Sequence, residues 1–169
     1  MASLPCDIRI SKLIMIGYLM SVLDEAIIIG AGLSIQGIFK WHSEDKMNSF
    51  NIKAKFANES ESDLIAILNA YATFKDMRDN KYFNNETAER RWCSDNGLDY
   101  KNLHEMRLWI DEITKRLFQL NIKTLPGGHQ PQWNKSEKIF ILKIVFAAAF
   151  GVANCFLPSP FLVKLPTSR

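Results

Sequence analysis

The sequence predicts an all-α fold, a helical bundle, and three observations support this prediction. Apolar residues recur at spacings of three and four in several stretches, which is the period of an α-helix. Residues suited to helix capping precede the apolar runs, and a loop rich in Pro and Gly, residues 122–135, separates the last run from the others. With 169 residues, the chain is about one domain long and can bury a core.

Two apolar runs at the start of the chain predict the first two helices. Asp7 is the expected N-cap of a helix over residues 8–19. Ser21, followed by Asp24, is expected to start a second helix that extends through residue 33 and is fully buried, because it is rich in Ile and small residues.

The second run contains two short motifs that imitate nucleotide-binding chemistry. Asp-Glu-Ala-Ile at 24–27 imitates a magnesium-binding box, but the chain has no GxxxxGK[ST] phosphate loop. Its carboxylates are therefore interpreted as capping and surface-pairing groups. Gly30-Ala31-Gly32 lacks the surroundings of a phosphate loop and is interpreted as a place where two helices approach closely.

Two further helices are predicted before residue 75. Residues 43–57 are expected to form an amphipathic helix, and Ser60 to Asp63 provides the cap of the next one. Asn69 lies beside the second stripe and is expected to form a hydrogen bond between helices. Residues 75–86 are polar and predict a loop. The expected buried stripes are Met47, Phe50, Ala54 and Ala57, and then Leu64, Ile67, Leu68, Tyr71 and Phe74.

Residues 87–120 predict a short helix and then a long one. The short helix, residues 87–96, is expected to stop at Gly97, and its Trp92 is expected to pack inside the bundle. In the long helix Asn102 is the expected N-cap, and His104 is interpreted as part of this cap. Ion pairs are expected from Asp111 to Lys115 and from Glu112 to Arg116, and the apolar stripe comprises Leu103, Met106, Ile110, Ile113, Leu117 and Leu120.

The last apolar run, residues 139–157, is interpreted as a buried helix. Lys143 lies inside it and Gly151 and Asn154 interrupt it, so no membrane span is expected. The net charge of +3 permits nucleic acid as a partner without indicating it. The odd count of three cysteines favours a reducing compartment, Cys93 is interpreted as a packed thiol, and the isolated histidines predict no metal site.

A set of short motifs occurs in a fixed order along the chain. They are Trp92-Cys93, Asn96, Leu98-Asp99-Tyr100, Leu103 and Met106-Arg107, preceded by Leu68-Asn69 and Tyr71. This order resembles the helicase-associated (HA2) region of DEAH/DExH-box RNA helicases, in which a Trp-Cys pair, an Asn, a Tyr and a helix with a central Arg follow one another. Residues 141–150, ILKIVFAAAF, are also similar to a string found in the Spindle-E type, the Tudor-domain-containing helicases of the germline piRNA pathway.

The resemblance implies a noncatalytic accessory segment of an RNA helicase. It implies the end of a winged helix and first bundle helices in residues 1–34 and a ratchet-like helical bundle in residues 35–157; residues 158–169 are expected to form a tail. The bundle would close over single-stranded RNA beside the parent's motor domains, which would hold ATP and Mg, so no cofactor is expected in this segment. Cytoplasmic germ granules and their piRNA-pathway proteins are the implied location and further partners.

Basic residues near the strand would supply phosphate contacts that do not depend on sequence. Arg107 matches the family's central Arg, and it either contacts RNA or pairs with a carboxylate in the bundle, the second being the favoured interpretation. The plain alternative for surface lysines is a solvated helix face. The expected RNA-binding residues are Lys53, Lys55, Arg90, Arg91, Arg107, Lys115 and Arg116.

Two other functions remain open at this point. The segment is either a helical platform that docks protein partners without RNA, or the same accessory region of another DExH helicase, in splicing or ribosome assembly. Salt-dependent RNA binding separates the first alternative from a channel wall. The sequence contains no catalytic constellation, so enzymatic activity is expected of the parent helicase and not of this chain.

Overall fold

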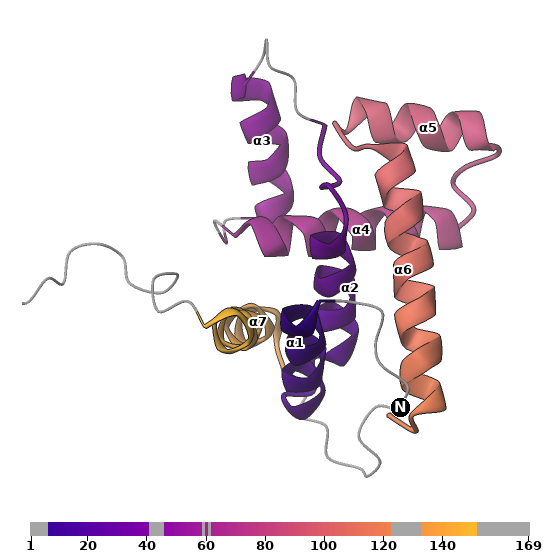
Figure 1. Cartoon of the computed structure of the whole chain (residues 1–169). Helices are drawn as coiled ribbons and strands as arrows, with labels where there is room; N and C mark the ends of the chain where they lie inside the picture. The colour runs from indigo at the N-terminus through magenta and orange to yellow at the C-terminus, as the bar shows by residue number, and fades with distance from the viewer. Residues whose placement is uncertain (1–6, 41–45, 59, 61, 123–132, 152–169) are drawn as a thin grey trace, which may run out of the picture.

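The computed structural model describes residues 7–40, 46–58, 60, 62–122 and 133–151. Within these ranges the chain forms seven α-helices and no strand, which confirms the predicted all-α fold. Figure 1 shows α2 in the middle of the bundle, between α6 on one side and α1 and α7 on the other. The helices are α1 (Ile8–Leu19), α2 (Leu23–Ser34), α3 (Lys46–Ala57), α4 (Asp63–Asp79), α5 (Glu86–Asp95), α6 (Tyr100–Gln119) and α7 (Lys135–Phe150).

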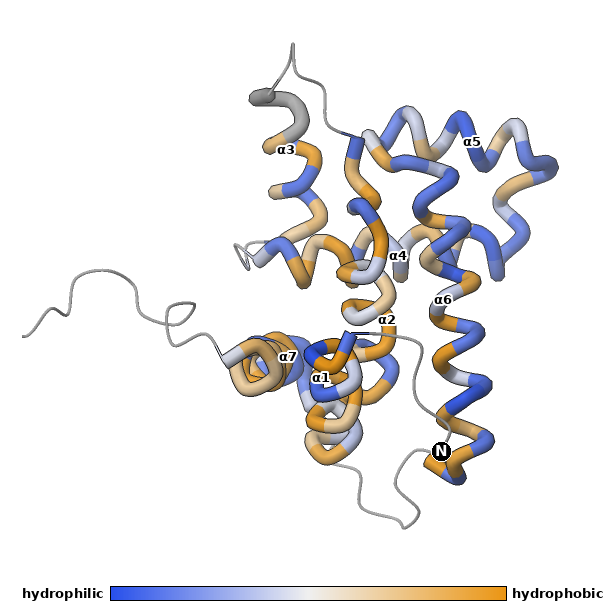
Figure 2. The backbone as a smooth tube through the Cα atoms, viewed as in Figure 1, coloured by the Kyte–Doolittle hydropathy of each residue, from blue (hydrophilic) through white to orange (hydrophobic). Residues whose placement is uncertain are grey.

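Helix α2 is the centre of the hydrophobic core. It contributes Ala31 to a cluster with α3, α4, α5 and α6, Ile29 to a cluster with α1, α4 and α7, and Ile27 to a cluster with α1 and α6. Figure 2 shows α2 and α7 as largely hydrophobic, whereas α5 is largely hydrophilic. Most of α2 is enclosed by other helices, as the sequence predicts, but Asp24 and Leu33 are exposed, so the prediction of a fully buried helix is wrong at these two positions.

The glycines of α2 allow the close approach that the sequence predicts. A Cβ atom added to Gly30 would lie 3.0 Å from Cγ2 of Ile10 on α1. One added to Gly32 would lie 2.5 Å from Cγ2 of Ile67 on α4. Both glycines therefore fill positions where a side chain would push a neighbouring helix away.

Helix starts differ from the sequence prediction at two places. Asp7 caps α1 as expected and accepts a hydrogen bond from the backbone N of Arg9. Ser21 does not cap α2, because its backbone is left-handed (φ +58°) in the tight turn after α1. Asn102 does not cap α6 either, since Asp99 accepts the bond from the backbone N of Asn102, whose side-chain Nδ2 donates to the carbonyl of Gly37.

The predicted stripe of α3 is wrong at Phe50 and Ala54 and confirmed at Ala57. Phe50 is 66% exposed and Ala54 is exposed, whereas Phe56 and Ala57 are buried and Ile52 packs against the core. The side of α3 that faces the core is therefore the one that carries Ile52 and Phe56. The predicted start at residue 43 and the side chain of Met47 lie outside the described residues.

Helix α4 continues further than the sequence predicts, while its interhelical hydrogen bond is confirmed. The predicted loop at 75–86 begins only after Asp79, because no Gly or Pro interrupts residues 75–79 and Arg78 is held by an ion pair to Glu89 on α5. As expected, Asn69 joins two helices: its Nδ2 donates to the carbonyl of Phe56 on α3 at 2.8 Å.

Helix α7 corresponds to the last apolar run and packs against α1. Asn134 and Glu137 form a capping box at its start, and Gly151 ends it in a left-handed conformation. Most of the predicted loop at 122–135, the end of the apolar run and the predicted tail at 158–169 lie outside the described residues. In the part of the chain that is described, no helix is long and apolar enough to cross a bilayer.

Candidate nucleic-acid interface

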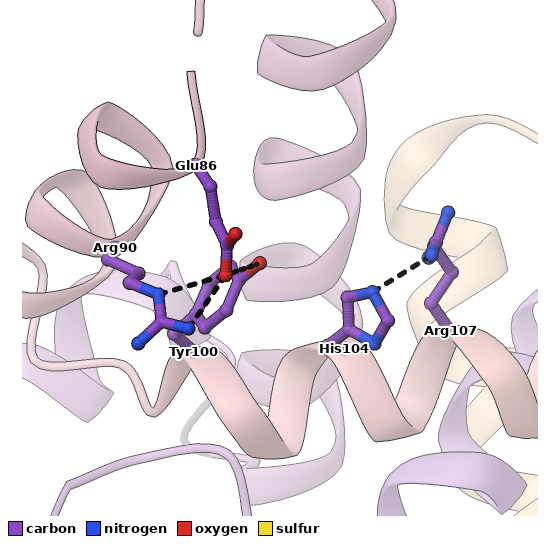
Figure 3. Close-up of polar contacts among 5 residues, drawn as sticks. All are labelled: Glu86, Arg90, Tyr100, His104 and Arg107. Atoms are coloured by element: carbon purple, nitrogen blue, oxygen red, sulfur yellow. Dashed lines mark hydrogen bonds and ion pairs between the residues drawn. The ribbon is translucent and has the colours of Figure 1, made fainter.

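Five side chains from α5 and α6 lie together and form what we call the arginine-aromatic row: Glu86, Arg90, Tyr100, His104 and Arg107. Figure 3 shows Tyr100, His104 and Arg107 on the same side of α6. Their spacing explains this arrangement, because residues separated by four and then three positions share one face of a helix. Arg90 reaches the row because α5 ends at Asp95 and the left-handed backbone of Gly97 (φ +64°), the residue predicted to stop the helix, then turns the chain into α6.

One end of the row is a cluster held by a carboxylate. Arg90 donates from Nη2 and Nε to Oε1 of Glu86 at 2.7 and 3.1 Å, and the hydroxyl of Tyr100 donates to the same oxygen at 3.4 Å. The guanidinium carbon of Arg90 lies 4.9 Å from the ring centroid of Tyr100. This geometry is that of a cation-π contact, in which a guanidinium stacks over an aromatic face.

The charge states of this cluster follow from its contacts. The hydrogen bonds from Arg90 hold the pKa of Glu86 below its ordinary range. The pKa of Tyr100 is raised, first by burial and then by the nearby carboxylates Glu89 and Glu86. At neutral pH Glu86 is therefore ionised and Tyr100 is protonated, so the cluster retains its donors.

The other end of the row is a contact between His104 and Arg107. The Nη2 of Arg107 lies 3.0 Å from Nε2 of His104. Because arginine only donates hydrogen bonds, Nε2 must accept, and the imidazole is the neutral tautomer with its proton on Nδ1.

The expected pairing of Arg107 with a carboxylate is wrong for the described residues. No Asp or Glu oxygen lies within 4.0 Å of it, because its Nη2 is directed back along α6 to His104. Its Nε is buried without an acceptor. His104 likewise does not form part of the helix cap, which Asp99 provides.

The structure places the other predicted basic residues away from the row. Lys53 pairs with Asp63 at 2.6 Å, between α3 and the start of α4, and Lys55 is exposed on α3. Arg91 is 85% exposed and lies 4.0 Å from Asp95 on its own helix. The structure therefore brings together only Arg90 and Arg107 of the seven predicted residues.

Two predicted basic residues of α6 differ in their pairing. Arg116 pairs with Glu112 at 2.6 Å, which confirms the predicted ion pair. Lys115 is exposed and forms no ion pair with Asp111 in the described part of the chain, so that expectation is wrong. Arg116 follows Arg107 by nine positions, which places it about 180° around the helix on the opposite face.

Two predictions about packing next to the row are confirmed. Trp92 is partly buried and its ring centroid lies 6.1 Å from that of Phe74 and 5.8 Å from that of Phe83. Cys93 is fully buried, and burial raises the pKa of its thiol to about 11. Within the described residues, no group of three or more His, Cys, Asp or Glu is placed to hold a metal ion.

Sequence reasoning did not include Glu86, Tyr100 and His104 among the site residues. The signal that indicates two of them is their position on the polar side of α6, in phase with Arg107. A helical wheel of residues 100–107 would have placed Tyr100, His104 and Arg107 on one face. Glu86 gave no such signal, because only the turn between α5 and α6 brings it to Tyr100.

Chemically, the row offers cations and flat rings and no nucleophile. A guanidinium can donate to a phosphate, and the faces of Tyr100 and His104 can stack on bases. Arg90 is already fixed by Glu86, and its side chain remains 63% exposed. The row thus has the groups that bind a single-stranded nucleic acid without reading its sequence.

No protein-family model matches the chain. It is 40% identical over 159 residues to the probable ATP-dependent RNA helicase spindle-E of Anopheles gambiae, and 40% identical over 159 residues to that of Culex quinquefasciatus. It is 35% identical over 160 residues to the protein of the same name in Drosophila mojavensis. Each alignment covers 94% of this chain but only 10 or 11% of the relative. The chain is therefore homologous to a segment, about one tenth of the whole, of the spindle-E ATP-dependent RNA helicases.

Proposed function

We propose that this chain is a noncatalytic accessory segment of a spindle-E-type RNA helicase and forms part of its channel for single-stranded RNA. The single observation that carries the proposal is the arginine-aromatic row on α5 and α6. The homology to a segment of RNA helicases supports it, because the row carries groups that bind single-stranded RNA. The segment corresponds in this proposal to the HA2 region preceded by the end of a winged helix.

The row binds RNA by position and charge in this proposal. A base stacks on one face of the Tyr100 ring. Arg90, which Glu86 holds in place, covers the opposite face of the same ring. Arg107 donates to a phosphate of the same strand. Because Glu86 fixes Arg90 before the strand arrives, binding requires little further ordering of that side chain.

The rest of the proposal concerns the whole protein. ATP and Mg are bound by motor domains outside this segment, and the movement of those domains drives the strand past the row. The parent acts in piRNA-mediated transposon silencing in the cytoplasm of germ cells, with other germ-granule proteins as partners. The resemblance to the Spindle-E type supports this part.

The test is a titration of the purified chain with fluorescent single-stranded RNA at low and moderate salt. Arg107→Ala is expected to weaken binding several-fold and to reduce the dependence on salt by about one phosphate contact. Arg116→Ala is the matched control, because it removes the same charge from the opposite face of α6. Equal losses in both variants, or none in either, would show that the row does not contact the strand.

A second candidate function is a helical platform that docks proteins without RNA. The observation that favours it is the exposure of large apolar side chains on α1 and α7, where Ile8 is 83%, Leu19 68% and Phe140 62% exposed. The same titration distinguishes the two functions, since a protein platform has no salt-dependent affinity for RNA. Ile8→Ser and Phe140→Ser would then weaken capture of the parent's motor domains.

A further inference from the structure

A cleft of about 500 Å³ opens between α2, α4 and α6, next to the Arg107 end of the row. Ile27 and Ile28 of α2, Phe74 of α4 and Ile110 of α6 contribute its apolar surface. Pockets of this size hold small organic ligands, and apolar walls suit a flat ring. Arg107 belongs both to the row and to the cleft, so the two sites are continuous.

Tyr71 lines this cleft together with charged groups of both signs. Burial is the first cause of the raised pKa of Tyr71; Asp111 and Asp79 raise it further, while Arg107 and Arg78 lower it. The hydroxyl is therefore protonated at neutral pH and is a donor. Because carboxylates and guanidinium groups line the same cleft, it presents both acceptors and donors to a ligand.

Among the residues that the structure describes, several charged groups of the cleft form no ion pair or leave a donor atom unpaired. Asp24, Asp79 and Asp111 form no ion pair within 4.0 Å among the residues that the structure describes. The Nη1 of Arg78 and the Nε of Arg107 are buried without an acceptor. Buried donors without partners are uncommon in folded proteins. An acceptor on a ligand in the cleft would satisfy either donor, while another nitrogen of Arg78 contacts Glu89 and another nitrogen of Arg107 contacts His104.

The mixture of charges selects the class of ligand. A phosphate would meet three carboxylates as well as the arginines, so the attraction is largely cancelled. A nucleobase is neutral, flat and carries donors and acceptors on its edges. Guanine fits best, because its O6 and N7 accept from arginine, while its N1–H and N2–H₂ donate to a carboxylate.

We propose that this cleft binds one unstacked guanine of the RNA strand, with Arg107 and Arg78 on its acceptors and Asp111 on its donors. The inference rests on the proposed function, because the strand that lies along the row delivers the base. Arg107 and Asp111 are four positions apart on α6 and so lie on one wall of the cleft. The segment would thus prefer guanine at one position of an otherwise sequence-independent channel.

Two binding experiments test this inference. Guanosine, adenosine and uridine 5′-monophosphates are titrated into the labelled chain and followed by amide chemical shifts, and only the guanosine nucleotide is expected to shift residues of α2, α4 and α6 around the cleft. In the second experiment, one guanosine inside a twelve-residue oligouridine is expected to raise affinity several-fold over oligouridine alone.

Asp111→Asn is expected to abolish the gain from guanosine, measured within the variant as the ratio of its affinities for the two oligonucleotides. Glu105→Gln is the matched control, since it removes the same charge from an exposed position of α6 outside the cleft. Oligouridine binding without any gain from guanosine would overturn the guanine site and leave the channel proposal standing. Guanosine nucleotide binding that depends on Asp111, with no binding of oligouridine, would support the site and overturn the channel.

Discussion

Helix α6 has two different faces: one is buried in the core and the other carries the row. One face buries Leu103, Met106, Ile113 and Leu117, each no more than 2% exposed. The other presents the row, where the contacts are hydrogen bonds, one ion pair and one cation-π contact between partly exposed groups. Burial of an apolar side chain raises the free energy of unfolding by kcal/mol, whereas an exposed polar contact raises it by tenths of a kcal/mol. Stability and binding therefore belong to different residues of one helix and can be changed separately.

The largest effect on stability is expected when a side chain of the buried face is shortened. Leu103→Ala should lower the free energy of unfolding by about 2–5 kcal/mol, because it leaves a cavity in the cluster formed with α2, α3, α4 and α5. Leu108→Ala is the same substitution on the same helix, but Leu108 is 55% exposed, so the loss should stay below about 0.5 kcal/mol. Denaturant unfolding measures both, and similar losses would disprove the division between the faces.

The buried cluster also predicts how stability depends on pH. The pKa of the Cys93 thiol is raised from 9.0 to about 11, chiefly by desolvation. A thiol whose pKa is higher in the folded state favours folding below its unfolded pKa, and this contribution is lost as pH rises from about 9 to about 11. The expected loss is on the order of 2 kcal/mol.

Cys93→Ala separates this contribution from other alkaline titrations. The variant should unfold more easily at pH 7, because its smaller side chain leaves space in the cluster. The difference in stability between the unaltered chain and the variant should then shrink between pH 9 and 11. A difference that is constant over this range would mean that the thiol is solvated in the folded protein.

The buried face was predictable from the sequence because many apolar residues repeat in phase. The stripe of α6 was anticipated at its four buried residues, but its last predicted member, Leu120, is 42% exposed and follows the end of the helix. The close approach at Gly30 and Gly32 was also anticipated. The apolar residues of α3 do not mark a single side of the helix. Packing against α4 therefore determines which side is buried, and Phe50 is exposed. The predictions that Ser21 and Asn102 are N-caps were wrong, because the turns before these helices place other residues at the cap positions.

The row was predictable only in part, since side-chain partners depend on contacts across helices. Arg90 and Arg107 were anticipated as candidates, but their relation to each other requires the turn at Gly97. The identity of the partner of Arg107 could not be read from spacing alone. Both His104 and Asp111 lie within one turn of it, and only the structure selects the histidine.

The smallest effect is expected at the ion pair between Glu112 and Arg116, which sits away from both the core and the row. The hydrogen bond from Arg116 lowers the pKa of Glu112, so the pair favours folding above the ordinary pKa of 4.5 and this contribution is lost as pH falls. Both side chains are more than a third exposed, so Glu112→Gln should cost little even at neutral pH and less still in acid or in high salt. Thermal unfolding of the variant at pH 7 and pH 3 measures this, with Lys115→Ala as the control that removes a neighbouring cation without an ion pair in the described residues. A loss in Glu112→Gln as large as that in Leu103→Ala would mean that polar contacts on α6 hold the fold, and the separation between the two faces would have to be abandoned.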